Sequence, residues 1–126
     1  MSERPAALIA VMLRTGGWLA VLAVVVVSLL PGSLRPHVLP NNYEEHFAAY
    51  LITGCILGAG YPGPRLRLLF AAALAVGAGA LELSQVFIAG RTASIADFAA
   101  GVAGGWLGLH LPYLVDRLSG RGSRPT

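Results

Sequence analysis

The sequence predicts an all-α integral membrane bundle of four transmembrane helices, with both termini in the cytoplasm. Of its 126 residues, 56% are hydrophobic and only 12% are charged, about half the charged fraction of ordinary soluble domains. The apolar residues form long runs that end at turn-forming residues, and arginines flank these runs. The length suits one domain, residues 1–119, followed by a cytoplasmic tail, residues 120–126, whose Gly, Ser, Arg and Pro content predicts disorder.

The first helix is predicted from about Gly16 to Leu30, where Pro31-Gly32 ends it. The helix can start as early as about Pro5 if the Arg14 side chain reaches the lipid headgroups. A signal peptide is the alternative interpretation. It is disfavoured because small residues are missing from the cleavage positions after the run.

The other three helices are predicted over Tyr43–Gly60, Leu66–Ala89 and Ser94–Val115. The turn 61–64, with two prolines, separates the second from the third. The third segment is close to the ~20 residues that cross a bilayer. Because residues 90–93 are a short turn, the third and fourth helices should be antiparallel neighbours.

The arginines orient these segments, because cytoplasmic loops carry an excess of positive charge. Seven of the nine arginines lie in the N-terminus, the second loop and the C-terminal tail. Only Arg35 and Arg91 lie in the other two loops, which are therefore predicted to face outward. Because the arginines follow the segment ends, contact with lipid explains them better than binding to nucleic acid.

Seven polar residues near the outward ends of the segments are the candidate functional site. Ionisable side chains are costly at this depth and usually face the interior of a bundle. The candidate ligand-binding residues are His46, Tyr50, Glu82, Gln85, Arg91, Ser94 and Asp97. Glu82, about seven residues before the outer end of its segment, is expected to lie roughly 10 Å deep. A carboxylate at that depth must be protonated, or else paired with a cation such as Arg91 or a charged His46.

Two of the helices carry stripes that are polar at the outer end and glycine further in. They are His46, Tyr50, Gly54 and Gly58 on the second helix, and Ser94, Asp97, Gly101, Gly104 and Gly108 on the fourth. Glycine stripes allow close helix packing in lipid, so tight contact is expected below a polar pocket. A homo-oligomer through these stripes is a further prediction.

Structural roles compete with functional ones at several of these residues. Tyr50 suits an interfacial aromatic belt, and Arg91 suits an anchor to lipid phosphate. Ser94 suits an N-cap with Asp97 three residues later. No catalytic residue is assigned and no cofactor is expected. A lone cysteine, Cys55, excludes an internal disulfide, and one histidine with two carboxylates does not predict a metal site without further ligands.

Three segments in order resemble the VanZ-like family of small integral membrane proteins, named after a protein associated with resistance to the glycopeptide teicoplanin. The family pattern is His-Phe-x-x-Tyr, then Glu-x-x-Gln, then Arg-x-x-Ser-x-x-Asp before a helix of small residues. This chain matches it over about residues 42–110, at segments Glu45–Tyr50, Glu82–Phe87 and Arg91–Asp97. Many members carry Asp-Lys where this chain has Asn42 and Tyr43, and Asn where it has Gly101.

The resemblance and the polar residues together favour a protein of the bacterial inner membrane that binds an anionic lipid headgroup or a cell-envelope precursor and influences glycopeptide sensitivity. Arg91 and His46 would then contact phosphate. Two alternatives remain. One is a small membrane enzyme in which His46 and Glu82 form an acid–base pair. The other is a proton-coupled carrier, or a structural partner of a larger complex.

Overall fold

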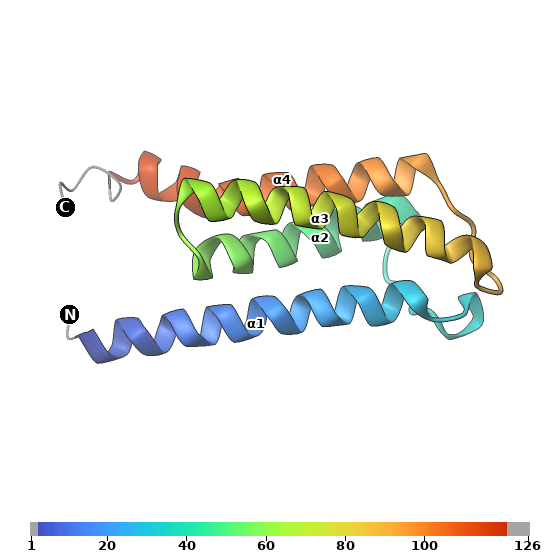
Figure 1. Ribbon diagram of the computed structural model, residues 1–126, viewed down its shortest axis with the longest axis horizontal. Helices are drawn as coiled ribbons and strands as arrows, with labels where there is room; N and C mark the ends of the chain where they lie inside the picture. The colour runs from blue at the N-terminus through green and yellow to red at the C-terminus, as the bar shows by residue number, and fades with distance from the viewer. Residues whose placement is uncertain (1–2, 121–126) are drawn as a thin grey trace.

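The helices lie side by side along one long axis (Figure 1). The computed structural model describes residues 3–120, which form four α-helices, two short 3₁₀ turns and no strand. The α-helices are α1 (Glu3–Leu29), α2 (Asn42–Gly60), α3 (Pro64–Ser84) and α4 (Ile95–Leu118), and the turns are η1 (Gly32–Leu34) and η2 (Gln85–Phe87). The all-α prediction is confirmed for these residues.

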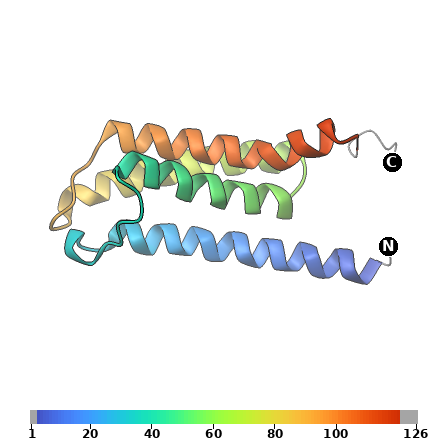
Figure 2. The same cartoon turned by 180° about the vertical axis from the view of Figure 1, so that it is seen from behind.

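The beginning of α1 and the end of α4 lie at the same end of the bundle (Figures 1 and 2). The loops that join α1 to α2 and α3 to α4 lie at the other end, called the loop end below. Among the described residues, three helices are long and apolar enough to cross a membrane: α1, α3 together with η2, and α4. α2 does not join them, since Glu44, Glu45 and His46 occupy its first turns.

The closest helix packing is between α2 and α4, where the two glycine stripes meet. A Cβ atom at Gly104 or Gly108 of α4 would collide with the backbone oxygens of Phe47 and Leu51 on α2. The α2 stripe glycines approach the α4 backbone in the same way. The predicted tight contact is therefore present within one chain. The predicted homo-oligomer could use the glycine stripes only if a second chain displaced this contact between α2 and α4.

α1 packs against α2, and hydrogen bonds join the two helices at the end of the bundle opposite the loop end. Arg14 donates from Nε to the Gly60 carbonyl at 2.9 Å, and Trp18 donates from Nε1 to the Tyr61 hydroxyl at 2.8 Å. Between them, Gly17 is buried against α2. The helix begins at Glu3, close to the extended alternative, and Arg14 binds the end of α2, whereas the sequence placed it at the lipid headgroups.

The outer end of α3 differs from the prediction. The α-helix ends at Ser84, five residues before the predicted Ala89, and Gln85–Phe87 forms a tighter 3₁₀ turn. This turn places the Gln85 amide against α1, where its Nε2 donates to the Ser28 carbonyl at 3.2 Å. Glu82 therefore lies in the last turn of α3, and the expectation that seven residues of helix follow it is wrong.

Candidate functional site

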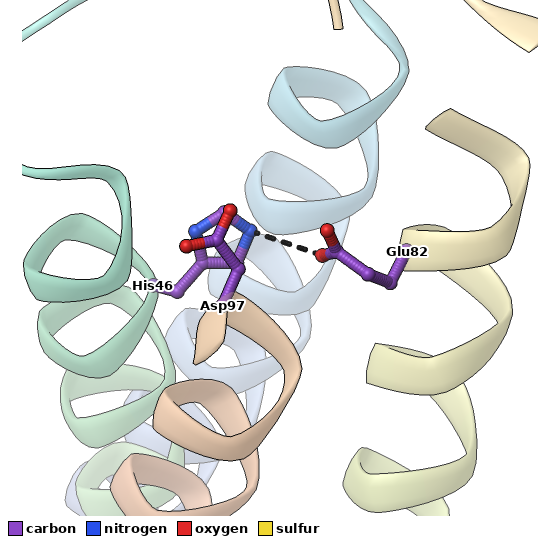
Figure 3. A group of neighbouring side chains, drawn as sticks. All are labelled: His46, Glu82 and Asp97. Carbon is purple, nitrogen blue, oxygen red and sulfur yellow. Dashed lines mark ion pairs between the residues drawn. The ribbon is translucent and has the colours of Figure 1, made fainter. Parts of the chain in front are cut away.

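Three side chains from three helices meet at the loop end of the bundle (Figure 3). His46 comes from the first turns of α2, Glu82 from the last turn of α3 and Asp97 from the first turn of α4. One nitrogen or oxygen atom of each lies within 4.8 Å of the others. Glu82 and Asp97 are only 7% and 5% exposed. The fold thus brings together three of the residues that the sequence proposed as a site.

Ser94 joins the Glu82 carboxylate to the first turn of α4. Its hydroxyl accepts a hydrogen bond from the Asp97 backbone N–H at 3.3 Å, which confirms the predicted N-cap of α4. Its own backbone N–H donates to Oε1 of Glu82 at 2.7 Å. The end of α3 is therefore joined to the start of α4 through a carboxylate, which leaves Oε2 of Glu82 to face His46.

The orientation of His46 follows from its second ring nitrogen. Nδ1 lies 2.8 Å from the backbone carbonyl oxygen of Asn42. Because a carbonyl only accepts, Nδ1 must carry the proton. A neutral His46 then presents the lone pair of Nε2, which lies 3.6 Å from Oε2 of Glu82. That separation is too long for a hydrogen bond.

Tyr50 lies inside the bundle, so the aromatic-belt interpretation of this residue is wrong. It is 4% exposed. Its ring atoms lie 3.3 Å from where a Cβ atom of Gly101 would stand. Gly101 thus makes room for this ring, and an asparagine at this position would require the ring to move.

Arg91 binds the end of α1 and does not contact Glu82 directly. Its Nη1 donates to the carbonyls of Val27 and Leu30 at 3.1 and 3.2 Å. The pKa of the Arg91 guanidinium is lowered, first by burial and then by the nearby charge of Arg35. The carboxylates of Glu82, Asp97 and Glu45 oppose this shift but do not reverse it. Arg91 thus satisfies carbonyls that the last turn of a helix leaves free. Of the two partners predicted for Glu82, His46 lies 3.6 Å from it, whereas Arg91 forms no ion pair with it among the described residues.

Arg35 is the main residue that the sequence interpretation missed. It is 9% exposed, its Nη2 lies 2.5 Å from Oε2 of Glu45, and its Nη1 donates to Oδ1 of Asn42 at 2.7 Å. The other Glu45 oxygen accepts from the backbone of the loop before α2. A sequence signal existed, because Glu45 in an apolar segment needs a partner and few cations lie on that side.

Two cavities border these residues. A small polar cavity of about 80 Å³ is lined by Gly32, Arg35, His37, Asn42, His46, Gln85, Gly90, Arg91, Thr92 and Asp97. A larger groove of about 370 Å³ lies between α1 and α2, and its walls are mostly apolar. It is lined by Ala23, Val24, Val27, Ser28, Arg35, Pro36, Val38, Leu39, Glu45, His46, Ala48, Ala49, Tyr50 and Arg91. Arg35, His46 and Arg91 border both, so the groove ends at the polar cluster.

No protein-family model, curated protein or solved structure matches this chain. The chemical capacity of the site therefore rests on its own geometry. That geometry offers two buried carboxylates, an imidazole with a defined tautomer and two partly or fully buried guanidinium groups, all beside an apolar groove. Such a set can hold an anion at the arginines or a cation at the carboxylates.

Proposed function

We propose that this chain is a VanZ-like protein of the bacterial inner membrane that binds an anionic lipid headgroup or a cell-envelope precursor and thereby influences glycopeptide sensitivity. One observation carries the proposal: the groove between α1 and α2 is lined mostly by apolar residues, and Arg35 and Arg91 border it together with Glu45 and His46. An acyl or prenyl chain suits the walls of such a groove, and a phosphate suits its end.

In the membrane, α2 acts as the fourth span beside α1, α3 and α4, and both termini lie in the cytoplasm. The distribution of arginines supports this orientation, since only Arg35 and Arg91 lie in the loop-end segments of the sequence. The two are also engaged with Glu45 and with the carbonyls of α1. The loop end then faces outward, and the groove opens at the depth of the outer headgroups.

Lipid binding is expected to depend on both ends of the groove. Arg91→Gln should weaken binding of phosphatidylglycerol about tenfold or more, because a charge-assisted hydrogen bond to phosphate is lost. Ala49→Trp should remove binding by filling the apolar part. Native mass spectrometry of the delipidated protein measures both effects, with phosphatidylcholine of the same tails, a prenyl phosphate and inorganic phosphate as the other ligands.

Matched variants separate this result from general damage. Arg65→Gln removes an exposed arginine outside the groove, and Ala72→Trp adds the same ring at an exposed position of α3 outside its lining. Both should bind phosphatidylglycerol like the unaltered protein. Equal adducts in Arg91→Gln and Arg65→Gln would refute an arginine-centred site. Retention of inorganic phosphate without lipid preference would refute the role of the groove.

A membrane enzyme that acts on such a lipid is the second candidate function. It is favoured by the approach of His46 Nε2 to Glu82 Oε2, 3.6 Å apart at the end of the groove. A neutral imidazole in this tautomer can accept a proton, as a general base does. If Glu82→Gln and His46→Ala leave glycopeptide sensitivity of the host unchanged while lipid binding persists, the enzyme function is rejected.

A further inference from the structure

His46, Glu82 and Asp97 present hydrogen-bond acceptors to one another and few donors. The imidazole Nδ1 is used by the Asn42 carbonyl, so a neutral ring offers only a lone pair at Nε2. Both carboxylates also offer lone pairs. Three acceptors that converge within 4.8 Å repel one another unless a positive species lies among them.

Asp97 provides the second, independent observation. It is 95% buried, with 5% of its surface exposed, and its carboxylate accepts no hydrogen bond from residues 3–120. Its oxygens are therefore not fully enclosed, and Asp97 lines the small polar cavity. Buried carboxylates are normally hydrogen-bonded, paired or coordinated to metal. Figure 3 shows the Asp97 side chain in the same cluster as His46 and Glu82, whose ligand atoms all lie within 4.8 Å of one another.

We propose that His46, Glu82 and Asp97 bind one divalent transition-metal ion of the zinc class, through Nε2 and one oxygen of each carboxylate. The 3.6 Å between Nε2 and Oε2 of Glu82 is too long for a hydrogen bond. It is near the ~3.4 Å that separates two ligands of a tetrahedral zinc ion. The widest separation, up to 4.8 Å, must shorten on binding.

The surroundings of the three ligands are those of a metal site. Metal-binding histidines usually donate their other N–H to a carbonyl or carboxylate, and His46 does so to Asn42. Glu82 is oriented by the backbone N–H of Ser94. The small polar cavity lies beside His46 and Asp97, so the fourth position of the ion would face a space that holds water or an anionic oxygen.

The charges around the site give the net charge that a metal and its simplest competitor, a proton on His46, would each leave. Three carboxylates, at Glu45, Glu82 and Asp97, face two guanidinium groups, at Arg35 and Arg91, which leaves one excess negative charge. A proton on the imidazole would neutralise it. A divalent ion would leave one positive charge, which an anionic oxygen in the cavity would balance. Metal binding at these ligands does not require the lipid site.

Cobalt and zinc binding test this site directly. The purified protein, stripped of metal with a chelator, is expected to bind about one Co²⁺ per chain. The bound Co²⁺ should give the visible spectrum of a four-coordinate ion, and Zn²⁺ should displace it. Loss of a residue that only supports a metal ligand weakens metal binding about 10- to 100-fold. Because His46→Ala and Asp97→Asn each remove a ligand itself, each should weaken Co²⁺ binding by at least this much. His110→Ala is the matched control, since its Nδ1 likewise bonds the carbonyl four residues earlier.

A measurement on the unaltered protein removes the risk that a variant misfolds. With ¹⁵N-labelled histidines, Zn²⁺ should shift the Nε2 resonance of one of the three histidines, and assignment should give His46. A shift at His37 or His110, equal Co²⁺ affinity in His46→Ala, or an imidazolium that ignores Zn²⁺ would each overturn the metal site. The lipid titration should also be repeated with a chelator present. Lipid binding should persist without metal, so failure of the metal site can be told apart from failure of the lipid-binding groove.

Discussion

Gly108→Val is expected to lower the free energy of unfolding by about 3 kcal/mol, the upper part of the range for overpacked sites. A Cβ atom at Gly108 would overlap the backbone oxygen of Leu51 and approach the backbone nitrogen of Cys55. Neither is the end of a flexible side chain, so α2 and α4 must separate. Unfolding in mixed micelles, followed by circular dichroism, measures the loss.

Gly77→Val is the matched control, because it makes the same exchange within α3. A Cβ atom at Gly77 meets nothing within 4 Å. Gly77 is half-buried and borders a cavity, so the added side chain enters open space. This variant should therefore unfold within about 0.5 kcal/mol of the unaltered protein. Equal destabilisation of the two variants would mean that the cost comes from valine in a helix and not from the contact between α2 and α4.

Arg35→Ala is expected to cost about 3 kcal/mol, because it leaves the Glu45 carboxylate buried without its cation. The side chains of this pair are only 6% and 14% exposed, so solvent screens them little. The loss should appear in the same unfolding measurement. It should also increase proteolysis of the loop before α2, where the backbone of Val38 and Leu39 donates to Glu45.

A double variant separates the ion pair from the loss of packing. In Arg35→Ala with Glu45→Gln, no charge is left unpaired, and the glutamine oxygen can still accept from the loop. The double variant should therefore be more stable than the sum of the single losses predicts, by about 1 kcal/mol or more. Strict additivity would refute the pair, and Arg65→Ala, which removes an exposed arginine, should change little.

The sequence predicted the helices well where its signals are local, whereas α1 begins at Glu3 and not at about Gly16. The cap at Ser94, the limits of α2 within one residue and the facing glycine stripes all follow from residue type and helical spacing. The end of α3 did not follow in the same way. Its apolar run continues past Ser84, and the 3₁₀ turn is associated with a bond from Gln85 to α1, which the local sequence does not contain.

The candidate site could be predicted as a set of residues but only in part as a set of partners, since His46 was one of two partners expected for Glu82. Helical spacing brought His46, Glu82 and Asp97 to one end of the bundle, where the structure also has them. Which cation meets which carboxylate depends on loops. The η1 turn brings Arg35 to Glu45, and the α3–α4 loop sends Arg91 to the carbonyls of α1. Spacing along helices carries no information about either.

The attachment of α1 has a consequence for which lipids the groove would discriminate. Near one end, Arg14 and Trp18 fasten this helix, and near the other its carbonyls accept from Gln85 and Arg91. Between them its valines line the groove and a second cavity of about 390 Å³ against α2 and α3. Apolar packing holds the middle of α1, so an outward displacement there would leave these hydrogen bonds intact. The groove would then accommodate lipid tails of different length or branching. The headgroup, bound by the polar residues of the groove, would determine which lipid is selected.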